Sequence, residues 1–224
     1  MVRHEASHSQ SHRRHAHARL FHDRRQLRIG LFGGSFNPAH DGHLHLSNLA
    51  KRNLQLDEVW WIVSPQNPLK PTGEMALLVD RLASCRALVA GNSYIRVIAP
   101  EVEFGSSLTF QTLKTLKQRC SRHHFYWLMG ADNMVTFPNW QRHKMIAASM
   151  PIAVIDRPGY SYQAMSRGEL LLKGRLSARK LARTSLSGQQ FSPSWCFIAG
   201  RRHHASATAL RQAGLQSAFV ESHN

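Results

Sequence analysis

The sequence predicts an α/β protein with a Rossmann-like, doubly wound parallel sheet of about six strands in a single domain. From Leu27 onward, short β-branched or aromatic runs alternate with longer amphipathic runs. This alternation is typical of βαβ units and a parallel sheet. The strand-like runs are almost continuously apolar, as expected for strands that helices cover on both faces.

Each expected element follows from one of these runs. The expected strands are residues 27–32, 58–63, 94–98, 124–129, 151–155 and 194–198, and the expected helices are 43–54, 75–90, 108–120, 139–148 and 206–213. Residues 159–193 break the alternation, so we expect an insertion of loops with one short helix near 169–183. The folded domain is expected to span residues 27–224.

Residues 1–26 differ in composition from the rest of the chain. They are rich in His, Arg and Ser, and six of the 15 histidines fall within the first 22 positions. The segment lacks the apolar region of a secretory signal and the hydrophobicity needed to fold. We expect a disordered basic leader; a transit peptide, a metal-binding tract or residues ahead of the true translation start are the alternatives.

The composition narrows the classes of partner. The chain has 224 residues and a formal net charge of +16, which suits polyanions such as nucleotides, nucleic acid or acidic membranes, although a solvated surface also explains it. No run approaches the roughly 18 apolar residues of a membrane span. Cys85, Cys120 and Cys196 lie far apart without a C-x-x-C pair. They are expected to be buried free thiols of a cytoplasmic protein rather than metal ligands.

Residues 33–43, GGSFNPAHDGH, are the most informative segment. They join an expected strand to an amphipathic run, and the amide groups and dipole at a helix N-terminus favour anions. His40 and His43, three positions apart, add donors or positive charge at the same place. The spacing is neither that of G-x-G-x-x-G nor that of a Walker A loop. The segment therefore predicts a phosphate-binding site of another kind.

A second polar segment follows the last expected strand. Ser206 and Thr208 open the expected final helix, where hydroxyls cap amide groups or bind phosphate. Arg211 adds a planar cation. From these residues alone, a plain helix cap with a surface arginine is the favoured interpretation.

Taken together, the two segments resemble the two signatures of the nucleotidylyltransferase superfamily. Residues 33–43 are similar to G-x-F-[DN]-P-x-H-x-G-H, with Asn37 where Asp is common, and residues 206–211 are similar to S-[SA]-T-x-[IL]-R. The resemblance implies transfer of a nucleotidyl group to an acceptor phosphate, with release of pyrophosphate.

Three segments in the middle of the chain indicate which molecule accepts the nucleotidyl group. The segments 107–113, 130–133 and 137–140 resemble those of bacterial nicotinate-nucleotide adenylyltransferases, and the resemblance covers about residues 28–160 and 194–213. Trp140 can stack on a flat ring, although a tryptophan in the core is the commoner role. The loop 64–71 lacks the histidine of the family, and Lys70 is expected to replace it as a phosphate contact.

The resemblance implies a set of site residues. The catalytic residues would be His40, His43 and Arg211, which contact the ATP phosphates and stabilise charge. The remaining ATP-binding residues would be Gly33, Gly34, Ser35, Phe36, Asp132, Ser206 and Thr208. The mononucleotide would contact Ser35, Asn67, Lys70, Thr109, Asp132 and Trp140, with Trp140 on the nicotinate ring and Thr109 at its carboxylate. Mg²⁺ would accompany the ATP phosphates without a dedicated protein cage.

The implied function is adenylyl transfer from ATP to nicotinate mononucleotide in NAD biosynthesis. Nicotinamide mononucleotide or phosphopantetheine as the acceptor is the alternative within the same superfamily. A nucleic-acid-binding module is the alternative from another class, and the absence of RNP, KH and zinc-finger patterns argues against it. No membrane partner is expected, and a homo-oligomer stays open.

Overall fold

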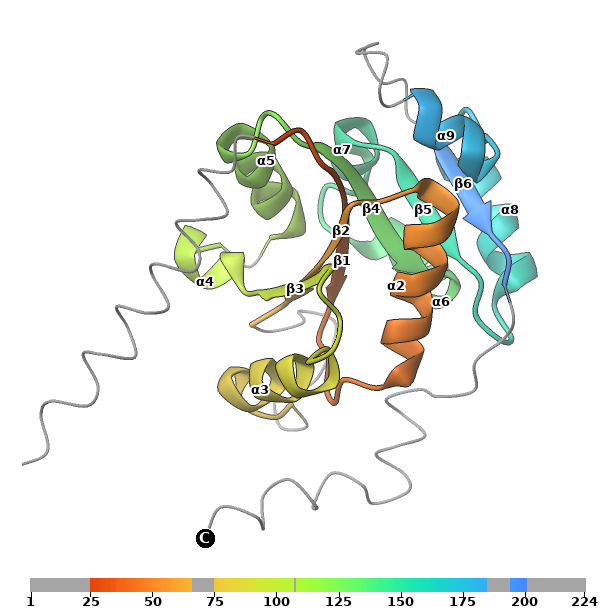
Figure 1. The fold of residues 1–224 in the computed structure, drawn as a ribbon. Helices are drawn as coiled ribbons and strands as arrows, with labels where there is room; N and C mark the ends of the chain where they lie inside the picture. Colours follow the sequence, from red (N-terminus) through yellow and green to blue (C-terminus); the bar gives the residue numbers. More distant parts are fainter. Residues whose placement is uncertain (1–24, 66–74, 107, 185–193, 201–224) are drawn as a thin grey trace, which may run out of the picture.

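The chain folds around one parallel sheet (Figure 1). The structure is a computed structural model and describes residues 25–65, 75–106, 108–184 and 194–200. The strand order is β3-β2-β1-β4-β5-β6, with every neighbouring pair parallel. The strands are β1 (Arg28–Gly34), β2 (Glu58–Val63), β3 (Ile95–Ile98), β4 (His124–Gly130), β5 (Ile152–Ile155) and β6 (Trp195–Ile198). The predicted doubly wound sheet is confirmed.

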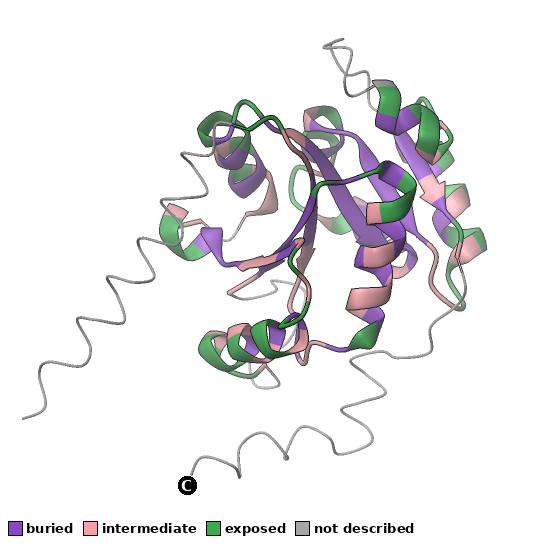
Figure 2. Cartoon of the chain, in the orientation of Figure 1, coloured by how far each residue is buried: buried purple, intermediate pink, exposed green. Residues whose placement is uncertain are grey.

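Helices cover both faces of this sheet. One face carries α2 (Asp41–Leu54), α3 (Leu78–Leu88) and α9 (Ala178–Thr184). The other carries α4 (Pro100–Phe104), α5 (Thr109–Arg119), α6 (Ala131–Thr136), the 3₁₀ helix η2 (Phe137–Asn139), α7 (His143–Ser149) and α8 (Ser161–Leu171). Figure 2 shows a buried sheet between helices whose outer sides are exposed.

Some elements differ from the sequence-based prediction. The helix expected over 139–148 begins at His143, because Phe137–Asn139 form a separate 3₁₀ turn. Two helices, α8 and α9, occupy the region where one short helix was expected near 169–183. Gly174, at φ 76°, lies between them, and a left-handed residue ends helical structure. The short helices α4 and α6 were not predicted. The leader 1–26 and the helix expected at 206–213 lie outside the described residues.

Strand side chains build two separate cores because successive residues point to opposite faces. Leu31 and Trp60 belong to one core, and Phe32 and Trp61 to the other. Cys85, Cys120 and Cys196 are free and buried, as predicted. Burial raises the pKa of Cys85 and of Cys196 to about 12, which leaves both thiols unreactive at neutral pH.

The strand order places the switch point between β1 and β4, where ligands of doubly wound sheets bind. Polar side chains follow the carboxyl ends of five strands. They are Ser35 after β1, Ser64 after β2, Glu101 after β3, Asp132 after β4 and Arg157 after β5. Within the described ranges, no helix has the length and apolarity to cross a membrane.

Candidate active site

The β1–α2 turn, residues 35–40, lies at the switch point and has an unusual backbone. Phe36 adopts φ 47°, a left-handed conformation that is costly for a bulky residue. Its ring is buried and stacks on Trp61, with ring centroids 4.9 Å apart and an angle of 18° between the planes. Packing against the core therefore holds a strained residue in place.

The two glycines before this turn contribute by their small size. Gly33 and Gly34 end β1, and the left-handed conformation falls on Phe36 instead. A Cβ on Gly33 would collide with the ring of Trp127 from β4. Glycine is therefore required at position 33 for close packing between neighbouring strands rather than for a positive φ.

His40 and His43 cap the N-terminus of α2 reciprocally. His40 is the N-cap, and its Nδ1 accepts from the Gly42 N–H at 3.1 Å. The Nδ1 of His43 accepts from the His40 N–H, also at 3.1 Å, and the ring centroids lie 3.9 Å apart. Because each Nδ1 accepts, the proton of each neutral ring is assigned to Nε2. The helix N-terminus thus carries two ring donors, while the amide groups of His40, Gly42 and His43 donate within the cap.

A buried chain of hydrogen bonds fixes the first turns of α2. Trp61 Nε1 donates to Ser47 Oγ, and Ser47 Oγ donates to the carbonyl of His43, both at 2.8 Å. Trp61 thus contacts the site twice, through this chain and through its stack on Phe36.

Asp132 and Arg157 form an ion pair across the ends of β4 and β5. Arg157 NH1 donates to Asp132 Oδ2 at 2.5 Å, and both side chains are about three-quarters buried. A Cβ on Gly130 would lie 2.5 Å from Asp132 Oδ1, so glycine makes room for the carboxylate. Sequence reasoning assigned Asp132 to the site but missed Arg157, although its place directly after a predicted strand was a usable signal.

Trp140 and Thr109 lie on the other side of the sheet from α2. Trp140 is half-buried and makes edge contacts with Phe137 and Trp127, at centroid distances of 5.6 and 6.3 Å. It precedes α7, and Thr109 begins α5, which packs against α7. The Arg142 guanidinium lies 5.8 Å from the Phe110 ring centroid and links the two segments. The fold thus brings Trp140 and Thr109 to one layer.

Five of the predicted site residues lie outside the described residues: Asn67, Lys70, Ser206, Thr208 and Arg211.

Glu101 is a buried carboxylic acid that sequence reasoning missed. It is 5% exposed, and its side chain is hydrogen-bonded to the side chains of Ser64 and Thr112. Burial raises the pKa of the Glu101 carboxyl to about 7, and the two hydrogen bonds oppose this increase. Glu101 thereby joins the ends of β2 and β3 to α5. Its place directly after Pro100 at the end of an expected strand was the available signal.

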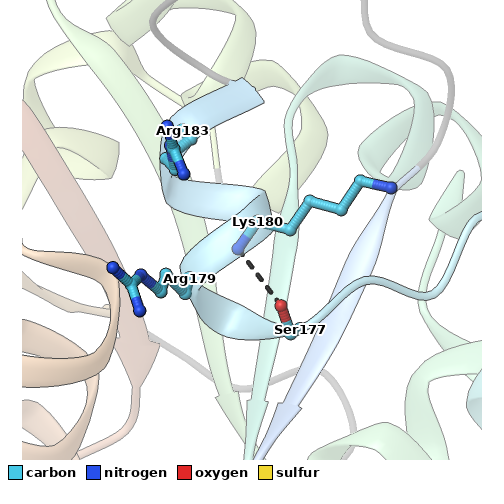
Figure 3. Close-up of a pocket in the computed structure, with 4 residues that line it drawn as sticks. All are labelled: Ser177, Arg179, Lys180 and Arg183. Atoms are coloured by element: carbon cyan, nitrogen blue, oxygen red, sulfur yellow. Dashed lines mark hydrogen bonds between the residues drawn. The ribbon is translucent and has the colours of Figure 1, made fainter.

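A surface hollow of about 530 Å³ lies away from these residues, at α9. It is lined by Ser177, Arg179, Lys180 and Arg183. Figure 3 shows the three cationic side chains extending from the helix in different directions, so they do not converge on one anion. The high positive charge is therefore not concentrated into a binding site here.

Comparisons with known proteins agree with this geometry. Residues 31–213 match the cytidylyltransferase-like family. Probable nicotinate-nucleotide adenylyltransferases of Methylorubrum extorquens (strain PA1) and Agrobacterium fabrum (strain C58) are 46% and 43% identical to the chain. The alignments cover 83% of this chain and 99% of the first relative, and 82% and 97% for the second.

A solved structure shares the fold. The nicotinic acid mononucleotide adenylyltransferase of Plasmodium falciparum, complexed with NaAD, superposes with a TM-score of 0.62 at 16% identity, over 83% of this chain and 82% of that chain.

A doubly wound sheet with a helix N-terminus at its switch point defines the class, an α/β nucleotide-binding protein. The chain belongs to the cytidylyltransferase-like family, and its relatives place it among the nicotinate-nucleotide adenylyltransferases.

The raised pKa of Glu101 predicts a pH-dependent stability. Between pH 4.5 and about 7 the folded protein holds this proton more tightly than the unfolded chain does. The stability that Glu101 contributes is therefore complete below pH 4.5 and is lost as the pH rises through 7. Glu101→Gln removes this loss. As the pH rises from 4.5 to 8, the free energy of unfolding of the variant should therefore increase by up to about 3 kcal/mol relative to that of the native protein.

Urea denaturation at pH 4.5 and at pH 8 measures this difference in the free energy of unfolding. The control is Glu103→Gln, because Glu103 is an exposed residue on the same helix. Its pairing with Arg119 at the surface contributes at most about 1 kcal/mol. Equal stability changes for native protein and Glu101→Gln across the pH range would contradict the prediction.

Proposed function

We propose that this chain transfers the adenylyl group of ATP to nicotinate mononucleotide, giving deamido-NAD and pyrophosphate in NAD biosynthesis. The observation that carries the proposal is the reciprocal cap of His40 and His43 at the N-terminus of α2, at the switch point of the sheet. The relatives named nicotinate-nucleotide adenylyltransferases, matched over nearly their whole length, support it.

The ATP phosphates would bind at the N-terminus of α2. The positive end of the helix dipole and the Nε2 donors of His40 and His43 are suited to an anion. Gly33, Gly34, Ser35 and Phe36 would lie against the nucleotide. We assign Ser206, Thr208 and Arg211 to the triphosphate from their sequence resemblance alone.

The mononucleotide would bind on the side of Trp140. Its indole, braced by edge contacts with Phe137 and Trp127, is suited to stacking on the nicotinate ring. Thr109 would read the ring carboxylate, and Asp132 would lie between the two substrates. Ser35, Asn67 and Lys70 complete this set by resemblance.

The chemistry needs no nucleophilic side chain. A phosphate oxygen of the mononucleotide would attack the α-phosphorus of ATP in line, forming a new P–O bond as the bond to pyrophosphate breaks. The protein would contribute alignment and stabilisation of the charge on the phosphates. Mg²⁺ would enter as part of the ATP substrate. We also propose a cytoplasmic location, in keeping with the buried free thiols.

An acceptor panel tests the proposal. Pyrophosphate release from ATP is measured with nicotinate mononucleotide, nicotinamide mononucleotide and phosphopantetheine. We expect the highest kcat/KM with nicotinate mononucleotide, by at least about tenfold, because one or two hydrogen bonds to the carboxylate distinguish it. A higher kcat/KM with phosphopantetheine would contradict the proposed acceptor.

Two substitutions at His43 separate capping from catalysis. The amide oxygen of His43→Asn can replace Nδ1 in the cap but supplies no donor at Nε2, whereas His43→Gln can place a donor there. We expect His43→Asn to fold and to lose about 100-fold in kcat, with a smaller loss in His43→Gln. His45→Ala, on the same helix, is the control. Less than a tenfold loss in folded His43→Asn would refute the catalytic role.

A further inference from the structure

Arg81 of α3 is a buried cation whose partners are backbone carbonyls. It is 2% exposed, and its three guanidinium nitrogens donate to carbonyl oxygens of three separate segments. The acceptors are Ser35 (2.6 Å), Ser64 (2.7 Å), Pro65 (2.8 Å) and Ala76 (2.9 Å).

This arrangement differs from a buried salt bridge. Within the described ranges, Arg81 takes part in none of the ion pairs. A guanidinium presents five N–H donors in a rigid planar fork. That fork connects the β1–α2 turn to the end of β2 and to the segment that leads into α3. Arg81 is therefore placed to set the relative positions of these segments.

The bond to Ser35 fixes the direction of one peptide group in the β1–α2 turn. In a planar trans peptide the C=O and the following N–H point in opposite directions. Since the Ser35 carbonyl points to Arg81, the Phe36 N–H points away from Arg81. This peptide directly precedes the left-handed conformation of Phe36, which persists only where the surroundings hold it.

A second hydrogen bond joins the β1–α2 turn to the segment that leads into α3. The Ala76 N–H donates to Asn37 Oδ1 at 3.1 Å, while the Ala76 carbonyl accepts from Arg81. Asn37 therefore has a defined partner at the signature position where the family often has Asp. The turn is thus held on both sides of Phe36.

We propose that Arg81 is a positioning residue for adenylyl transfer, which holds the Ser35–Phe36 peptide in the orientation that binds ATP. Arg81 contacts Ser35 and the end of β2. The effect on ATP therefore passes through the β1–α2 turn. This inference rests on the proposed function, because it requires the backbone of that turn to bind ATP.

The experiment compares Arg81→Lys and Arg81→Met, with Arg86→Met as the matched control because Arg86 is an exposed arginine of the same helix. A lysine ammonium retains the charge but donates from a single atom, so it cannot connect the same acceptors. Circular dichroism and thermal unfolding establish which variants fold. Steady-state kinetics then give kcat, the KM for ATP and the KM for nicotinate mononucleotide.

In each folded Arg81 variant we expect kcat to fall at least about tenfold and the KM for ATP to rise at least about fivefold, because small misplacements lower alignment steeply. The KM for nicotinate mononucleotide should rise by a smaller factor, because Ser35 is the only described residue assigned to that substrate that is hydrogen-bonded to Arg81. Arg86→Met should match the native enzyme. A variant that is only destabilised would contain a smaller fraction of active enzyme. Its apparent kcat would fall, and both KM values would stay unchanged.

Any other pattern in a folded variant overturns the proposal, and so does the failure of both Arg81 variants to fold. The native enzyme and His43→Asn, assayed alongside, separate the two hypotheses. If the native enzyme does not use nicotinate mononucleotide, the proposed function fails. If His43→Asn is impaired while folded Arg81→Lys is not, the positioning role alone fails.

Discussion

The site depends on one constraint: Phe36 must hold a left-handed backbone between β1 and α2. That conformation lets the chain turn from the end of a buried strand into a helix whose N-cap is His40. Three kinds of contact offset its cost: the stack of Phe36 on Trp61, the bond from Arg81 to Ser35 and the bond between Asn37 and Ala76. Strain at a functional turn thus coexists with a rigid α/β scaffold.

A residue assigned to ATP and a residue assigned to the mononucleotide pack against one shared side chain, that of Trp127. The Trp127 side chain fills the space that a Cβ on Gly33 would need. The same side chain makes an edge contact with the indole ring of Trp140. The end of β1, where Gly33 is assigned to ATP, and the indole assigned to nicotinate therefore pack against the same buried residue. This packing provides a physical route by which the separation of the two substrates is fixed before either one binds.

Much of this arrangement could be predicted from the sequence, because apolar periodicity and the 33–43 segment are local signals. The parallel sheet and the placement of His40 and His43 at a helix N-terminus followed from them, whereas the strand order and the reciprocal cap did not. Arg81 and Glu101 did not, because their importance arises from contacts between segments distant in sequence. The local hints were an arginine four residues before Cys85, on the same helix face, and a glutamate directly after Pro100. The left-handed backbone of Phe36 was not predicted, since glycine is the usual left-handed residue.

A crystal structure with a non-hydrolysable ATP analogue and nicotinate mononucleotide would show how the β1–α2 turn receives its ligands. We expect the triphosphate at the N-terminus of α2, with a phosphate oxygen about 3 Å from Nε2 of His43, Phe36 still left-handed and the nicotinate ring stacked on Trp140. A triphosphate bound away from α2, or a β1–α2 turn that abandons the left-handed Phe36 on binding, would contradict this expectation.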